Sequence, residues 1–188
     1  SRRRGAAVVG CLGREPAREL ALACLQDLAR TQRQSSFIPE LAATITAASI
    51  PIVLLKFAAL HVGGHLTEGS RAAADLDILV RDDDAAAVAE ILGGQGFFPV
   101  KSAAADHHLP PLLDPLGRVV EIHTTLPGLR EPTSRRFAGF AELRDAGMLD
   151  PAPGLGGLCF LPRADLLAVH AIVHGLAHHG GADAYPLS

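Results

Sequence analysis

Short strand-like runs alternate with helix-like runs along this chain, and the alternation predicts an α+β (α/β) fold. Residues 51–56 form an apolar run closed by Lys56, and residues 75–80 form an apolar run interrupted by two acids. After them, residues 57–66 and 82–92 carry apolar residues at helical spacing. Three parts follow from this: an N-terminal helical segment (1–50), a core (51–125), and a linker with a C-terminal helical segment (126–188), packed as one compact unit.

Composition restricts the class of protein. The 188 residues, 48% of them apolar and 20% charged, are enough for a substantial buried core. A net charge of -3 gives no case for a general nucleic-acid-binding surface. Cys11, Cys24 and Cys159 have no C-x-x-C spacing, so neither a disulfide framework nor a thiolate zinc site is expected, and the cytosol fits best. No apolar run approaches the roughly 18 residues of a membrane span, so no membrane partner is expected.

Two helices are predicted before the first strand. The first covers residues 15–31, where Pro16 suits a helix start and leucines recur at helical spacing. A polar break is expected at 32–36, and a second helix, from Pro39, ends before Pro51. Neither helix carries a group of reactive side chains, so both are interpreted as packing elements.

In the core segment, glycines, prolines and acids indicate the element boundaries. The strand at 51–56 leads into a short helix at 57–66, whose end Gly63 and Gly64 weaken. Three acids open the helix at 82–92, where they suit the positive end of its dipole, and glycines at 93–96 end it. Strands are expected at 97–101 and 118–123, and the segment 107–113, with its paired prolines, is expected to be a sheet edge.

Two acids at alternate positions mark the strand at 75–80 as unusual. Strand residues alternate between faces, so Asp75 and Asp77 project from one face while Leu76 and Ile78 project from the other. Neighbouring like charges repel, so a cation is expected between them, and Mg²⁺, which is often held by one or two carboxylates, is the simplest candidate. Without the metal, removal of Asp77 should leave folding intact or slightly improved. Alternatively, Asp75 caps a turn and Asp77 lies on a solvated face.

A third acid lies in the strand at 118–123. Val119, Glu121 and His123 share one face of this strand. If the strand neighbours the one that carries the two aspartates, Glu121 completes a cluster of three carboxylates.

Histidines are a second group of candidate ligands. His170, His174 and His178 share one face of the predicted helix that begins at 162. Zinc usually also takes a carboxylate or thiolate, and this helix offers only Asp165, so polar-face or core-edge histidines are the alternative interpretation.

Several short motifs follow one another along the chain: Leu54-Leu55-Lys56, Ala58-Ala59-Leu60, Arg71, Asp75-Leu76-Asp77-Ile78-Leu79-Val80, His107-His108, Pro110-Pro111 and Val120-Glu121-Ile122-His123. In order and spacing they resemble a family of uncharacterised bacterial nucleotidyltransferases in the polymerase-β-like superfamily. The resemblance covers residues 52–123 and implies a mixed sheet flanked by helices. It also implies two Mg²⁺ ions, with Mn²⁺ as an alternative, and transfer of a nucleoside monophosphate from a nucleoside triphosphate to an unknown hydroxyl acceptor on a small molecule or protein.

The resemblance implies roles by position. Asp75, Asp77 and Glu121 would be catalytic and would bind the metals, a role that suits in-line displacement between two cations. The expected nucleotide-binding residues are Lys56, Gly63, Gly64 and Arg71, and the expected substrate-binding residues are His107, His108 and His123. Instead of meeting a phosphate, Arg71 or Lys56 could brace the aspartate pair.

One position departs from the family pattern. The family usually has a glycine after the lysine, where the backbone approaches the triphosphate, and this chain has Phe57. If Phe57 fills that space, the protein is a non-catalytic nucleotide-binding or interaction module, such as a toxin-antitoxin partner. If Phe57 packs in the core, Gly63 and Gly64 or the Lys56 backbone receive the phosphates. A metallohydrolase built on the histidines is a further alternative.

Overall fold

The computed structural model describes residues 14–66, 72–100, 108–130 and 137–179. Its elements are, in order, α2 (Arg14–Ala47), β1 (Ile52–Leu54), α3 (Lys56–Val62), β2 (Leu76–Leu79), α4 (Asp82–Gly94), β3 (Phe98–Pro99), β4 (Leu112–Leu113), β5 (Val119–His123), β6 (Thr125–Arg130), β7 (Phe137–Gly139), α5 (Phe140–Asp145), β8 (Leu149–Pro151), β9 (Cys159–Pro162) and α6 (Ala164–His179). None of these described helices is both long and apolar enough to cross a membrane.

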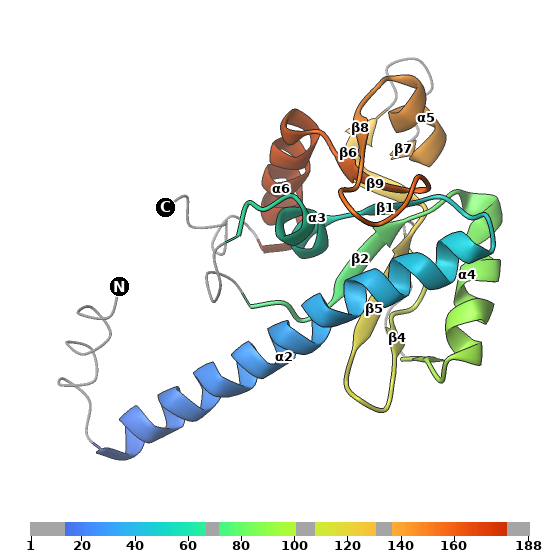
Figure 1. The fold of residues 1–188 in the computed structure, drawn as a ribbon. Helices are drawn as coiled ribbons and strands as arrows, with labels where there is room; N and C mark the ends of the chain where they lie inside the picture. Colours follow the sequence, from blue (N-terminus) through green and yellow to red (C-terminus); the bar gives the residue numbers. More distant parts are fainter. Residues whose placement is uncertain (1–13, 67–71, 101–107, 131–136, 180–188) are drawn as a thin grey trace.

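A seven-stranded mixed sheet in the order β3-β4-β5-β2-β1-β9-β8 forms the centre of the protein (Figure 1). Strand β2 runs parallel to β5 and antiparallel to β1, which in turn runs parallel to β9. A separate two-stranded sheet pairs β6 with β7. The predicted mixed sheet flanked by helices is therefore confirmed, and strands β8 and β9, from beyond residue 125, belong to it.

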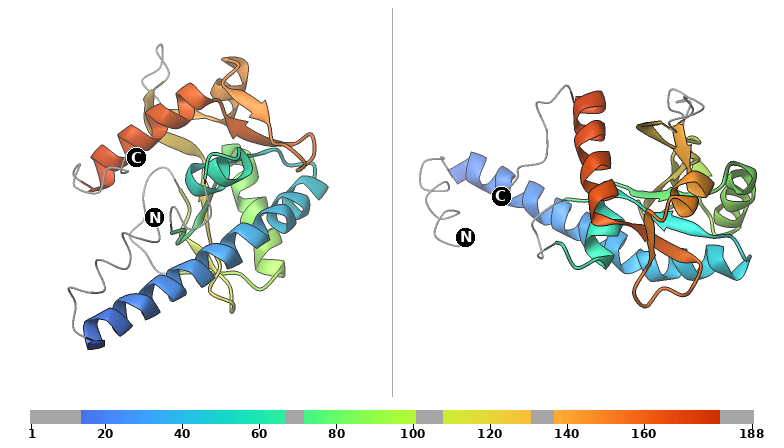
Figure 2. Two further views of the ribbon diagram at one scale, coloured as in Figure 1. Left: turned by 60° about the vertical axis from the view of Figure 1, so that its left-hand side comes forward. Right: turned by 90° about the horizontal axis from the view of Figure 1, so that it is seen from above.

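The central strands are mostly buried because a separate core covers each face of the sheet. On one face, Leu76 and Ile78 pack with buried residues of α2 and α4, such as Leu41 and Leu92. On the other face, residues such as Val53 and Leu79 pack with Phe140 of α5 and Leu166 of α6. Strand alternation places Asp77 on this second face, beside Leu79. The view from above in Figure 2 shows α6 and α2 on different sides of the strands.

The two predicted N-terminal helices are one continuous helix, α2, so the expected break at 32–36 is wrong. The hydroxyls of Ser35 and Ser36 each donate a 3.1 Å hydrogen bond to a carbonyl three residues earlier, so both polar groups are satisfied within the helix. Phe37 and Leu41 are at most 1% exposed on either side of Pro39, so their burial favours helix across the proline. Tertiary packing here outweighs the local preference.

The predicted edge at 107–113 is also wrong within the described residues, because β4 pairs with β3 on one side and with β5 on the other. The paired residues Leu112 and Leu113 follow the prolines, so no missing N–H interrupts the ladder. Pro111 contributes its carbonyl, which accepts a hydrogen bond of 2.8 Å from the N–H of Val100.

Candidate functional site

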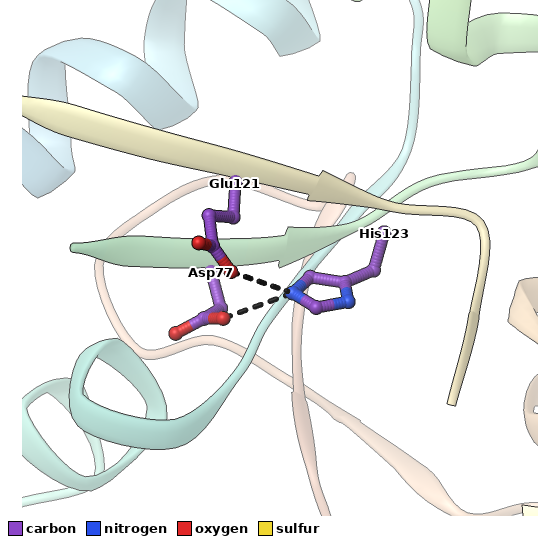
Figure 3. A group of neighbouring side chains, drawn as sticks. All are labelled: Asp77, Glu121 and His123. Atoms are coloured by element: carbon purple, nitrogen blue, oxygen red, sulfur yellow. Dashed lines mark hydrogen bonds and ion pairs between the residues drawn. The ribbon is translucent and has the colours of Figure 1, made fainter. Parts of the chain in front are cut away.

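Strands β2 and β5 lie side by side, with Asp77 paired opposite Glu121 and Leu79 opposite His123. Alternate residues of each strand face the same way, so Asp77, Glu121 and His123 project from one face of the sheet (Figure 3). One ligand atom from each of the three lies within 4.8 Å of those of the other two, a spacing from which small side-chain movements reach one ion. These three residues are called the carboxylate–histidine cluster below.

Asp77 is the buried centre of this cluster, with an exposed fraction of 1%. Its Oδ1 lies 2.5 Å from Nζ of Lys56 and 2.9 Å from Nε2 of His123. An ionised carboxylate can only accept, so the imidazole donates its Nε2 proton. The other oxygen, Oδ2, is buried and has no hydrogen-bond partner among the residues that the structure describes. The Asp77 carboxylate is thus fixed through Oδ1, and its Oδ2 is available to a ligand.

The pKa values of this pair have defined causes. Burial alone would raise the pKa of the Asp77 carboxyl, but the hydrogen bond from His123 and the charge of Lys56 hold it below its usual range. Burial opposes the charge of Lys56, yet the charges of Asp77, Asp75 and Glu121 raise its pKa above the ordinary value. The positive charge expected beside the acids is therefore supplied here by Lys56, and the pair is ionised at neutral pH.

Asp75 and Glu121, the other two predicted acids, are less buried than Asp77. Asp75 immediately precedes β2 and is partly buried. Its charge acts on Lys56, although Asp75 is not among the three residues whose ligand atoms lie within 4.8 Å of one another. The side chain of Glu121 is 20% exposed, against 3% for His123, and its Oε2 lies 3.7 Å from Nε2 of His123. Of the clustered carboxylates, Glu121 is the one that solvent reaches.

Phe57 packs in the core and does not point into an open phosphate site. It is 3% exposed, belongs to the larger core cluster and stacks on His61 with ring centroids 5.6 Å apart. The residue with left-handed backbone is instead Lys56, with a φ of 43°, while the N–H of Leu55 donates a 2.9 Å hydrogen bond to the carbonyl of Asp77. The strained turn therefore places Lys56 over Asp77, and position 57 does not require glycine.

Not all the predicted nucleotide-binding residues come together. Gly63 is the C-cap of α3, and Gly64 follows it, so both lie at the opposite end of this helix from Lys56. The carbonyl end of a helix is partially negative, which disfavours phosphate there. Arg71 and His107 lie outside the described residues.

The histidines contribute unequally. His108 is partly buried and meets the ring of His123 edge-on, with centroids 5.4 Å apart. His170 of α6 is 1% exposed and lies within electrostatic reach of Lys56, Asp77 and His123. Among the residues that the structure describes, the group with metal-ligand spacing contains one histidine and two carboxylates, which gives a multi-histidine centre no support. The side chains of His174 and His178 lie outside the description.

The sequence predicted a substrate-binding role for His123 and did not indicate its contact with Asp77. For Lys56 it left open a phosphate or the aspartate pair, and in the structure Lys56 contacts Asp77. For His123 a signal existed, because it follows Glu121 by two residues on the same strand face. For Lys56 no local pattern chose between the two roles, since its contact with Asp77 depends on the pairing of β1 with β2.

His170 predicts a pH effect on stability. Burial, followed by the charge of Lys56, lowers its pKa from 6.5 to about 4. The unfolded imidazole gains a proton below pH 6.5 while the folded one stays neutral, so stability is full above that pH and falls as the pH decreases. We expect a loss of about 2 kcal/mol between pH 7 and pH 5. Urea denaturation at both pH values measures it; a His170→Gln variant that loses as much would contradict this origin.

Comparisons with known proteins give the family and the fold of this chain. A family model described as uncharacterised nucleotidyltransferase matches residues 4–187. No curated protein matches this chain. The fold is similar to a crystal structure, at 1.87 Å resolution, of a candidate nucleotidyltransferase from Thermotoga maritima, with a TM-score of 0.54 and 12% identity over 78% of this chain and 87% of that one. Because the family match spans almost all of the sequence, this protein belongs to the uncharacterised nucleotidyltransferase family.

Proposed function

We propose that this protein is a Mg²⁺-dependent nucleotidyltransferase that transfers a nucleoside monophosphate from a nucleoside triphosphate to a hydroxyl group of a small molecule or protein. The observation that carries the proposal is the buried Oδ2 of Asp77, which has no hydrogen-bond partner among the described residues. A buried carboxylate oxygen without a donor is costly unless a cation meets it. Family membership and fold supply the reaction class.

Asp77 and Glu121 are the ligands we propose for the cations, with Asp75 completing the set. Oxygen donors suit Mg²⁺, and the adjacent nitrogen of His123 leaves Mn²⁺ as an alternative. When bound, two such ions neutralise the charge on the attacking and leaving oxygens. Lys56 and His123 both contact Oδ1 of Asp77, so they fix its orientation and leave Oδ2 for a cation.

Glu121 is the residue we propose as proton acceptor, because it is the partly exposed carboxylate of the cluster. The acceptor hydroxyl loses its proton to Glu121, and its oxygen forms a bond to the α-phosphorus. The bond between the α-phosphorus and the oxygen that bridges to the β-phosphate breaks, and pyrophosphate leaves with that oxygen. Lys56, which contacts the carboxylate of Asp77, supplies a positive charge next to the proposed position of the phosphates.

The test is incubation of the protein with Mg²⁺, cell lysate and each nucleoside triphosphate in turn, labelled at either the α- or the γ-phosphate. We expect the α-label, and not the γ-label, to appear on an acceptor. Transfer of the γ-label would indicate a phosphotransferase and contradict the proposal.

Glu121→Gln should abolish this transfer and lower the free energy of unfolding by no more than about 1 kcal/mol, because the side chain is partly exposed and its contact with His123 is long, at 3.7 Å. The matched control is Glu90→Gln, which removes an exposed acid on α4. Equal transfer by the two variants would remove Glu121 from the mechanism.

A further inference from the structure

Helix α2 contacts the two backbone segments that lead into the acid-bearing strands. Gln34 lies in the middle of α2, and its side chain is 0% exposed. Its Nε2 donates a 2.8 Å hydrogen bond to the carbonyl of Ala74 and a longer one, 3.5 Å, to the carbonyl of Val119. Ala74 immediately precedes Asp75, and Val119 begins the strand that carries Glu121. One side chain therefore bridges the starts of β2 and β5.

A second side chain of α2 acts on the same segment. Thr31 lies one turn before Gln34, on the same side of the helix. Its hydroxyl accepts a 3.0 Å hydrogen bond from the N–H of Ala73 and donates one of 2.8 Å to the carbonyl of Asp27. The N–H of Ala73 and the carbonyl of Ala74 are thus both bound to α2.

These contacts replace a missing part of the strand ladder. The ladder between β2 and β5 begins at the pair Leu76 and Val120, so Ala73 and Ala74 lie outside it. Ala73 is buried and its backbone polar groups require partners, and here side chains of α2 bind its N–H and the carbonyl of Ala74. Burial of the Gln34 amide is itself unfavourable unless its hydrogen bonds are made, and its Oε1 has no partner among the described residues. The stabilising contribution of Gln34 comes from the two hydrogen bonds that its Nε2 donates to the carbonyls of Ala74 and Val119.

We propose that Thr31 and Gln34 are positioning residues that fix where Asp75 and Asp77 lie relative to Glu121, and hence the affinity for the divalent cation. This inference rests on the proposed function, because it gives a role in cation binding to residues that touch no cation themselves. Groups that orient metal ligands typically change metal affinity 10–100-fold when they are removed. The carboxylates lie on separate strands, so the geometry of the cation site depends on the contacts that keep β2 and β5 in register.

The test compares Mn²⁺ affinity, measured by calorimetry, among four variants of the full chain. Gln34→Met keeps the length of the side chain and removes its donors, and Thr31→Val keeps the shape and removes the hydroxyl. Both should bind Mn²⁺ about 10-fold more weakly than the wild type. Thr31→Ser retains the hydroxyl and should bind normally. Gln95→Met, which removes a 2.9 Å hydrogen bond from the C-cap residue of α4 to Thr44 of α2, away from the acids, should also bind normally.

Amide hydrogen exchange of residues 73–79 gives a readout that needs no metal. Exchange there should be faster in Gln34→Met and Thr31→Val than in Gln95→Met. If a folded Gln34→Met or Thr31→Val protein binds Mn²⁺ as tightly as the wild type, the positioning role is wrong. If Gln34→Met does not fold, the result for Thr31→Val alone tests the proposal. If the wild type itself binds no Mn²⁺, the proposed function fails; unchanged exchange at 73–79 would then separately reject the positioning role.

Discussion

Asp77→Asn should abolish nucleotidyl transfer and the stabilisation of the protein by Mg²⁺, and should lower the free energy of unfolding by about 3 kcal/mol. The substitution leaves the Lys56 ammonium, whose side chain is 10% exposed, without the carboxylate that it contacts. Removal of one partner of a buried ion pair is strongly destabilising. Thermal melts with and without Mg²⁺, together with the α-label transfer assay, measure the two effects separately.

Asp114→Asn is the matched control for this prediction. Asp114 is also buried, at 3% exposure, and its Oδ2 lies 2.6 Å from Nε of Arg118. Its replacement should therefore destabilise the protein but preserve the increase in Tm that Mg²⁺ produces. If Asp77→Asn keeps the full Mg²⁺-dependent increase, Asp77 is a structural residue and the proposed cation site is wrong.

Phe57→Gly should lower the free energy of unfolding by about 5 kcal/mol, because it combines a large cavity with a glycine in helix α3. The ring is 3% exposed and contributes to the larger core. Chemical denaturation measures this loss. Phe57→Leu retains most of the buried volume and should lose less than about 1.5 kcal/mol, so it remains folded for nucleotide titration.

The matched control for Phe57→Gly lies in the other core. Phe140 is 2% exposed at the start of α5, and Phe140→Gly should cause a comparable loss. Wild type and Phe57→Leu should bind a nucleoside triphosphate equally in the presence of Mg²⁺. A Phe57→Gly protein that is as stable as the wild type and binds nucleotide more tightly would show that Phe57 occupies the phosphate site.

The sign of the Asp77→Asn stability effect shows what the sequence alone could not supply. From the sequence, Asp77 is one of two repelling acids, and its removal should relieve that repulsion. In the structure, Lys56 lies 2.5 Å from Asp77, although 21 positions separate them in the chain. Repulsion alone leaves out this ion pair, which forms because the pairing of β1 with β2 brings Lys56 to Asp77.

The continuous helix α2 shows a second limit. Polar residues at 32–36 and Pro39 indicated a break, and local propensity supports that prediction. Gln34 is polar because it binds the backbone ahead of Asp75, a partner 40 residues away in the chain. A buried polar residue with a distant partner looks, in the sequence, like an exposed residue in a loop.

The sequence by itself determined which residues share a strand face, because side-chain alternation is a local property of extended backbone. It therefore indicated that Asp77 and Glu121 each interrupt an apolar strand and that His123 shares a face with Glu121. Only the tertiary structure decided that β2 and β5 are neighbours, that Lys56 and His123 both meet Oδ1 of Asp77, and that Phe57 turns into the core. These contacts join segments far apart in the chain, and they form because burial of both sheet faces selects one strand order.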